Sequence, residues 1–123
     1  MSRFPCSCCG HLTLETGPGG YLICPVCFWE DDPMQLRWPH DPGGANRASL
    51  VEAQRNFIRF GACEEAMLAH VRPPRESEPV ADGWRIIDPE TDRFEPVDEP
   101  LHPWPDDNRA LYWWSPGFWK PVD

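Results

Sequence analysis

The sequence has no long apolar run and few basic residues. No stretch approaches the roughly 20 consecutive apolar residues that a membrane-spanning helix needs, and no basic start leads into an apolar segment as in a signal peptide. Lys and Arg together number 11, against 20 Asp and Glu, so the net charge is −9. We therefore expect a soluble, cytoplasmic protein that contacts no membrane. Because cationic side chains supply most of the affinity for phosphate groups, we also expect no binding to nucleic acid.

The sequence also lacks the common catalytic motifs. No His-x-Glu accompanies the Cys-x-x-Cys at residues 24–27, although a zinc deaminase would need one. The turn at residues 40–46 has neither the lysine nor the glycine spacing of a phosphate-binding loop. The acidic run Glu30, Asp31 and Asp32 could serve an enzyme that uses carboxylates, but we favour the interpretation that these side chains are solvated. We therefore predict that the protein is not an enzyme.

Four of the six cysteines form two pairs with the spacing of metal ligands. Cys6 and Cys9 make one pair, and Cys24 and Cys27 make the other. With two residues between its cysteines, each pair can form a tight turn that points both thiolates at one tetrahedral ion. Four sulfurs close the coordination shell, so the ion would stabilise the fold and would not catalyse a reaction. We predict a structural Zn²⁺ bound by these four cysteines.

Other interpretations of the cysteines stay open at this point. The pairs could be ordinary buried thiols or a redox pair, although a redox pair needs a single motif on a βαβ frame. Cys8 could replace Cys9 as a ligand, at the expense of the two-residue spacing. Cys63 lies just beyond a predicted helix, where a cysteine is more often a small buried apolar residue. We predict that neither Cys8 nor Cys63 is a ligand.

Residues 1–72 are predicted to form a small α+β domain that resembles a zinc ribbon. Residues 12–14 and 21–23 have the composition of short strands, and the turn between them is rich in glycine. They would form a β-hairpin that brings the two cysteine turns together.

A helix is predicted from about residue 50 to residue 60. Ser49 and Glu52 have the spacing of a helix N-cap and its partner, and Gly61 is a typical helix stop. A shorter helical stretch is expected over residues 64–70. At 100° per residue the apolar side of the main helix consists of Leu50, Val51, Ala53, Phe57, Ile58 and Phe60.

The proline-rich residues 73–79 read as a linker to a different kind of segment. Residues 80–123 hold five of the seven tryptophans, have an excess of acidic residues, and contain no cysteine and no helical period. We expect this segment to be mostly β or irregular and to pack on the first domain. Residues 84–88 and 93–97 would form a hairpin, and residues 110–114 could add a third strand.

Several separated motifs give the first part of the chain a family resemblance. They are Cys6-Ser7-Cys8-Cys9-Gly10, residues 23–32, residues 43–46 and residues 56–61. Together they resemble the bacterial CPCC cysteine-rich family over about residues 4–62, with Ser7 at the place of the namesake proline. The resemblance implies a zinc-binding domain without an established activity. It also implies a link to bacterial toxin and immunity genes, since some members lie beside such genes.

We predict a zinc-stabilised protein-binding module, most concretely an immunity or antitoxin protein that neutralises a basic toxin by direct binding. Acidic side chains would steer a basic partner, and aromatic side chains would supply affinity. The predicted contact residues are Trp104, Trp113, Trp114, Trp119, Asp106 and Asp107. The same tryptophans could instead pack the C-terminal segment onto the first domain. A nucleic-acid-associated zinc ribbon of the transcription or translation machinery is the alternative function, supported by the ribbon alone.

Overall fold

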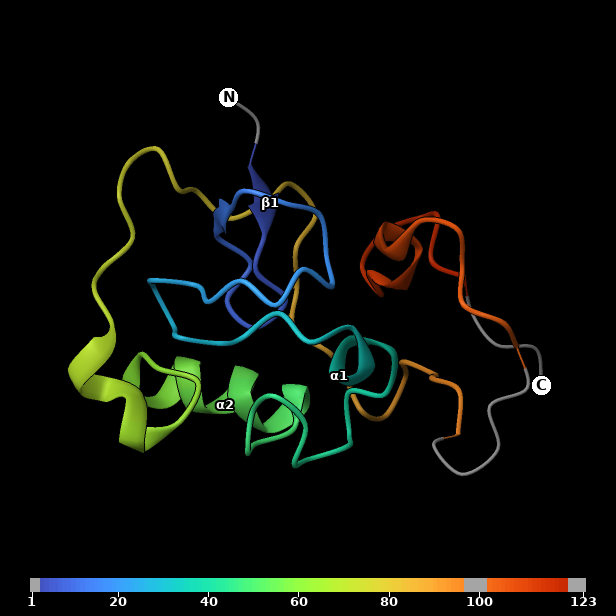
Figure 1. The fold of residues 1–123 in the computed structure, drawn as a ribbon, viewed down its shortest axis with the longest axis horizontal. Coiled ribbons are helices and arrows are strands. Elements are labelled where there is room, and N and C mark those ends of the chain that lie inside the picture. Colours follow the sequence, from blue (N-terminus) through green and yellow to red (C-terminus); the bar gives the residue numbers. More distant parts are fainter. Residues whose placement is uncertain (1–2, 97–101, 120–123) are drawn as a thin grey trace.

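A computed structural model describes residues 3–96 and 102–119 of the chain (Figure 1). Its elements are β1 (Phe4–Pro5), β2 (Leu12–Leu14), α1 (Pro33–Arg37), α2 (Leu50–Phe60) and the 3-10 helices η1 (Glu65–His70) and η2 (Asn108–Leu111). A two-stranded antiparallel sheet with a few short helices is a small α+β fold, as predicted. Within the described residues, no helix has the length and apolar character needed to cross a membrane.

The predicted hairpin between the two cysteine pairs is wrong. β2 pairs antiparallel with β1, with Phe4 opposite Leu14. Residues 21–23 do not join β2, because Ile23 forms an isolated antiparallel bridge with Glu30. Each cysteine pair therefore lies at the tip of its own small hairpin. A tight turn brings its flanking residues together at a low entropic cost, so local pairing replaces pairing across the longer glycine-rich loop.

Helix α2 forms where the sequence predicts it. The Ser49 hydroxyl oxygen accepts a hydrogen bond from the Glu52 N–H at 3.1 Å, as an N-cap does. At the other end Gly61 adopts a left-handed φ of 89°, and its N–H donates to the Phe57 carbonyl. In Figure 1 the helix lies along one side of the two cysteine hairpins.

The prediction is wrong for one position on the apolar side of α2. Ile58 is 65% exposed, whereas Gln54 is buried together with Leu50 and Ala53. The Gln54 side chain donates to the Ser7 carbonyl at 2.9 Å and accepts the N–H of Ile87 at 2.9 Å. A buried amide with both ends satisfied can take the place of an apolar side chain, and here it ties the first cysteine turn to the C-terminal segment.

Two short helices complete the first part of the chain. The helical stretch predicted over residues 64–70 is present as η1, a 3-10 helix. Helix α1 was not predicted, although Asp32 and Pro33 give a start signal for it. The Asp32 carboxylate accepts the Met34 N–H at 2.8 Å, and Pro33 occupies the first turn.

The C-terminal segment is irregular, and its predicted strands do not form. In residues 84–88 and 93–96 there is no strand, and the predicted strand end at residue 97 lies outside the described residues. The turn between them is closed by side chains, with the Arg85 guanidinium 2.7 Å from the Asp92 carboxylate. The third predicted strand is replaced by η2, which begins where the Asp107 carboxylate accepts the Arg109 N–H. Contacts with the first part of the chain, such as the one from Ile87, take the place of a strand ladder.

The segment after η1 runs beside the first cysteine hairpin. The Leu12 N–H donates to the Pro79 carbonyl at 2.9 Å, and His11 forms an antiparallel bridge with Val80. In residues 73–79, which were predicted as a linker, Glu78 is buried and forms an ion pair with Arg72 at 2.8 Å. These contacts position residues 79–84 against the cysteine cluster.

Candidate metal centre

Two turns with the same hydrogen bonds carry the four paired cysteines. In the first turn the Cys6 N–H donates to the His11 carbonyl at 3.0 Å, and the Gly10 N–H donates to the Cys6 carbonyl at 2.7 Å. We call this turn and its flanking residues 4–14 the first knuckle. The Cys-x-x-Cys spacing thus fixes both the turn and the short strands on either side of it.

The second knuckle, residues 22–32, repeats this pattern. The Cys24 N–H donates to the Trp29 carbonyl at 2.9 Å, and the Phe28 N–H donates to the Cys24 carbonyl at 2.8 Å. Phe28 therefore corresponds to Gly10 of the first knuckle, and Glu30 corresponds to Leu12.

Both knuckles need a left-handed residue directly after the second cysteine. Gly10 has a φ of 79° and Phe28 has a φ of 68°. Two factors restrict the first position to glycine. One is the left-handed φ, and the other is the Trp84 ring, because an added Cβ would lie 2.4 Å from Cδ2 of Trp84. At the second position a phenylalanine adopts the same strained conformation, at a cost of about 1–3 kcal/mol. The surrounding contacts therefore stabilise an unfavourable backbone at Phe28.

The two knuckles bring the Sγ atoms of Cys6, Cys9, Cys24 and Cys27 to within 4.8 Å of one another, and all four cysteines are buried. The Sγ atoms of Cys6 and Cys27 are 3.5 Å apart, and those of Cys9 and Cys24 are 3.8 Å apart. Zn–S bonds of about 2.3 Å in a tetrahedron place sulfurs about 3.8 Å from one another. The cluster therefore has the size and the donor set that a zinc ion requires.

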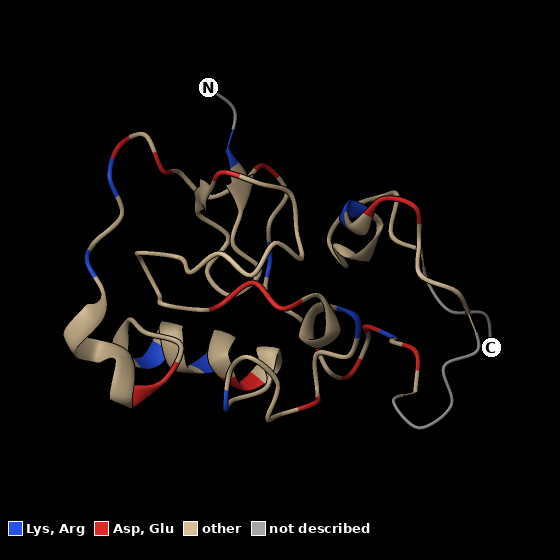
Figure 2. Ribbon diagram, in the orientation of Figure 1, with Lys and Arg blue, Asp and Glu red and all other residues tan. Residues whose placement is uncertain are grey.

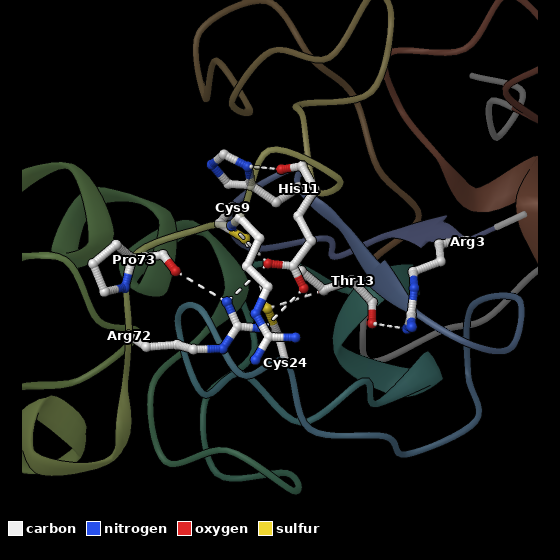
Figure 3. A network of polar contacts seen from close by, with 9 residues as sticks. Arg3, Cys9, His11, Thr13, Cys24, Arg72 and Pro73 are labelled. Atoms are coloured by element: carbon white, nitrogen blue, oxygen red, sulfur yellow. Dashed lines mark hydrogen bonds and ion pairs between the residues drawn. The ribbon is translucent and has the colours of Figure 1, made fainter. Parts of the chain in front are cut away.

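Hydrogen-bond donors and charge surround the sulfurs. The Cys8 N–H donates to the Cys6 Sγ at 3.4 Å, and the Thr13 hydroxyl donates to the Cys24 Sγ at 3.1 Å. Figure 3 shows Thr13 beside Cys24, and the charge of the Arg72 guanidinium interacts with Cys24 electrostatically. Burial raises the pKa of the Cys6 and Cys27 thiols, whereas hydrogen bonds from the neighbouring thiols, assisted by Thr13, lower the pKa of Cys24. Four thiolates can lie side by side here only when a cation neutralises them, so a metal that bound would displace the protons that burial keeps on the thiols.

The two remaining cysteines are buried but do not belong to the cluster. Cys8 and Cys63 are each 1% exposed. Burial is the main cause that raises the pKa of Cys63 to about 12, so this thiol is protonated at neutral pH. The Cys63 N–H donates to the Cys27 carbonyl at 2.8 Å. Cys63 therefore packs and supports the second knuckle as a small apolar residue.

Comparison with known families agrees with this geometry. The family described as "Cysteine-rich CPCC" matches residues 4–78, which is more than half of the chain. The chain belongs to the cysteine-rich CPCC family. The match includes both knuckles, α2, η1 and the buried Glu78, so the family unit extends beyond the residues 4–62 that carry the sequence resemblance. No curated protein matches the sequence.

The acidic run at the end of the second knuckle has a structural role. Asp31 and Asp32 are buried, so the expectation that these carboxylates are solvated is wrong. The Asp31 Oδ2 accepts the N–H groups of Gly19 and Gly20 at 2.9 and 3.4 Å, and burial raises the pKa of Asp31 to about 6. Asp32 accepts the Ala45 N–H at 2.9 Å in addition to capping α1. Both carboxylates hold loops that lie around the second knuckle.

The predicted partner-binding tryptophans outside the family unit lie in two different environments. Trp113 is 4% exposed and its Nε1 donates to the Arg85 carbonyl at 3.0 Å, so its ring is part of the core. Trp114 is half-buried between Trp84 and Tyr112, with ring centroids 4.9 and 4.2 Å away. Both rings pack against Trp84, and the Trp84 ring in turn lies against Gly10 of the first knuckle.

Trp104 and Trp119 surround a buried cation that the sequence did not reveal. The Arg37 guanidinium carbon lies 4.6 Å from the ring centroids of both, and 4.8 Å from that of Trp38. The same guanidinium forms an ion pair with buried Glu95 at 2.7 Å. We call these five residues the arginine cage. Its ion pair joins positions 58 residues apart, so no local pattern could have indicated it.

Three of the predicted contact residues are exposed at the surface, namely Trp104, Asp106 and Asp107. Trp104 is 43% exposed even though one face of its ring contacts Arg37. Asp106 and Asp107 are exposed, and Asp107 forms an ion pair with Arg109 at 2.6 Å. The structure therefore brings the four zinc-ligand candidates into one cluster and divides the six contact candidates between core and surface.

Proposed function

We propose that the protein is a zinc-stabilised protein-binding module that neutralises a basic toxin by direct contact, as an immunity or antitoxin protein does. The observation that carries this proposal is the closed shell of four buried sulfurs, which leaves a bound ion no open position for water or substrate. Zinc bound by Cys6, Cys9, Cys24 and Cys27 would supply folding free energy. In the described part of the chain, this is also the one group of His, Cys, Asp or Glu side chains arranged to hold a metal ion.

The charge of the chain favours a basic partner. The net charge of −9 would raise the association rate with a cationic protein and oppose contact with nucleic acid. Figure 2 shows an acidic stretch directly before η2. There Asp106 and Asp107 line a hollow of about 490 Å³ together with Phe4 and Pro18.

Exposed Trp104 is the aromatic anchor that this surface offers. Tryptophan is enriched at interface hot spots because it buries a large area with few rotatable bonds. Trp104 lies two residues before the acidic pair along the chain, so we expect one exposed segment to supply both apolar area and charge. Since Trp113 is core and Trp114 is half-buried, we place the contact on Trp104, Asp106 and Asp107.

Affinity capture with the tagged, zinc-bound chain from its own cells, followed by titration of the purified partner, tests the proposal. We expect a basic protein whose binding is weakened about 30-fold by Trp104→Ala, as for a hot-spot residue of about 2 kcal/mol. Ile86→Ala, at an apolar position of similar exposure outside the proposed contact residues, is the matched control and should leave the affinity unchanged.

The association rate and its salt dependence give a second test of the same complex. Asp106→Asn should slow association and flatten its salt dependence, whereas Glu76→Gln, at another exposed position, should not. The proposal is rejected if the partner's affinity does not change in the Trp104 and Asp106 variants. It is also rejected if the purified protein turns over a small molecule.

A further inference from the structure

The outer edges of the two knuckles differ. On the first knuckle, residues 79–81 of the same chain lie along the outer edge as an extended segment. The Leu12 N–H donates to the Pro79 carbonyl at 2.9 Å, and the Ala81 N–H donates to the Gly10 carbonyl at 2.8 Å. This is the pattern by which an added strand pairs with a sheet edge.

On the second knuckle only half of this pattern is present. Glu30, the counterpart of Leu12, donates its N–H to Oδ1 of Asn46 at 2.9 Å, and its carbonyl accepts from Nδ2 of Asn46 at 2.7 Å. The Asn46 side chain therefore replaces Pro79. For Ala81 there is no counterpart, because within residues 3–96 and 102–119 the Phe28 carbonyl accepts no hydrogen bond.

A hollow of about 270 Å³ lies beside Phe28, which corresponds to the residue Gly10 that pairs with Ala81 on the first knuckle. The apolar residues Ile23, Phe28 and Met67 line it, together with the acidic residues Glu30 and Glu64 and the basic residue Arg47. Two acidic residues against one basic residue give the lining residues a net negative charge. The hollow thus offers apolar contact, an unpaired acceptor in the described structure, and attraction for a cation.

Apolar exposure and backbone strain occur together in this knuckle and in the residue directly before it. Tyr21, Leu22 and Ile23 are consecutive and are 51%, 36% and 46% exposed. Tyr21 and Phe28 are the two non-glycine residues with positive φ in the described chain. Strained backbone persists where the surroundings enforce it, and it is concentrated at binding and catalytic sites.

We propose that this hollow binds an extended, positively charged peptide segment of a partner protein, which lies against the second knuckle as residues 79–81 lie against the first. One backbone N–H of the segment donates to the Phe28 carbonyl. A small apolar side chain contacts Ile23 and Met67, and a Lys or Arg pairs with Glu30 or Glu64. This surface beside η1 lies at the opposite end of the molecule from η2 (Figure 1), and Trp104 is not among the residues that line the hollow, so it is a second contact and does not depend on the first.

A synthetic peptide provides the probe. It copies residues 78–84 as an amide, with lysine in place of Glu78 and Asp82, because this segment already pairs with the first knuckle. Titrated into the isotope-labelled, zinc-bound full chain, it should shift the amide signals of Ile23, Phe28 and Met67. N-methylation of the peptide at the alanine removes the N–H proposed for the Phe28 carbonyl, and it should weaken binding by about tenfold.

Two variants on η1 locate the contact. Ala66→Tyr fills the hollow from an exposed position and should abolish the shifts, whereas Ala69→Tyr, one turn further along η1 and outside the hollow, should not. Absence of binding at about 1 mM peptide, equal binding of the N-methylated peptide, or indifference to Ala66→Tyr overturns the proposal. So does a dimer of the free chain that Ala66→Tyr dissociates, because a second copy would then be the occupant. None of these results bears on Trp104.

Discussion

The two parts of this protein are held together by different kinds of contact. Residues 4–72 are arranged around four sulfurs, a capped helix and buried carboxylates that bond to nearby loops. The described residues 78–96 and 102–119 contain no comparable local framework. They are held by aromatic rings, with Trp84 against Gly10 and Trp113, and by the arginine cage. We therefore expect the first part to depend on a bound metal ion, and the second part to depend on the first as a surface to pack on.

This difference implies an order of dependence. Loss of the metal should disturb both parts, because Trp84 packs on the first knuckle and residues 79–81 pair with it. Loss of a contact in the C-terminal segment should release that segment while the cysteine cluster still binds its ion. The following changes test this asymmetry.

The largest effect is expected from removal of one sulfur of the cluster. Cys24→Ala should abolish stoichiometric zinc and unfold the chain, because a structural zinc site contributes on the order of 10 kcal/mol, as much as the total stability of a small domain. Cys63→Ala, at an equally buried cysteine outside the cluster, should keep zinc and cost about 1 kcal/mol. Elemental analysis and circular dichroism of both variants provide the measurement. Equal zinc loss in the two variants would show that the ligand set is different.

The arginine cage should give the next largest effect and should act on the C-terminal segment. Arg37→Met leaves the Glu95 carboxylate buried without its partner, which costs about 3–5 kcal/mol. Tryptophan fluorescence should shift to the red as Trp104 and Trp119 become hydrated, while zinc content stays the same.

Arg85→Met is the control for the cage. It removes an ion pair with Asp92 in which the Arg85 side chain is 48% exposed, and such pairs contribute little to stability. If Arg37→Met and Arg85→Met destabilise the protein equally, the cage does not hold the C-terminal segment.

Much of the metal-centred part could be predicted from the sequence because its signals are local. Cys-x-x-Cys spacing indicates a tetrahedral site, and Ser49 and Gly61 mark the ends of α2 with groups that bond within one turn. Asp32 and Pro33 carry the same kind of signal for α1 and could have been used. The glycine-rich loop, in contrast, suggested a hairpin that does not form, since each knuckle pairs its own flanking residues first.

The aromatic part could not be predicted because its contacts join distant positions. Nothing near Arg37 indicates Glu95, and the period of α2 does not indicate that Gln54 would bond to Ile87. The tryptophans gave a correct indication of large apolar area, but the sequence could not divide buried Trp113 from exposed Trp104. Which of these rings is buried depends on tertiary contacts, such as the contact of Trp113 with Trp84.

A methyl group at Gly10 tests the contact between the two parts. Gly10→Ala introduces strain at a φ of 79° and places a Cβ against the Trp84 ring, so we expect a loss of about 3 kcal/mol. Gly43→Ala is matched in backbone, with a φ of 81°, but has no atom within 4 Å of the added Cβ, and it should cost about 1 kcal/mol. If both variants lose the same stability in thermal unfolding, the Trp84 ring can move away from the added methyl group at no cost. The two parts would then be only loosely joined.

The ion pair at the junction should give the smallest effect, and it should depend on pH. The Arg72 guanidinium is the main cause that lowers the pKa of Glu78 from 4.5 to about 2. The folded protein thus keeps this carboxylate charged at pH values where the unfolded chain has bound a proton. Its contribution to stability is complete above pH 4.5 and is lost as the pH falls towards 2.

Comparison of Glu78→Gln with the natural protein isolates this pair, because protonation of the cysteine cluster affects both in the same way. The difference in unfolding free energy should be largest above pH 4.5 and should vanish towards pH 2. Glu76→Gln, at an exposed neighbouring position, should show no such pH dependence. A constant difference between natural protein and Glu78→Gln over this range would mean that the ion pair does not form in solution.

Metal stoichiometry combined with cobalt substitution tests the central claim most directly, namely that Cys6, Cys9, Cys24 and Cys27 bind one structural zinc ion. The purified chain should contain one zinc per molecule. Exchange for Co²⁺ should give the visible bands of a tetrahedral site and the strong sulfur-to-cobalt absorption of four thiolates, and Cys8→Ser should leave this spectrum unchanged. A chain that is folded and free of metal, or a cobalt spectrum typical of an open site with bound water, would contradict the account.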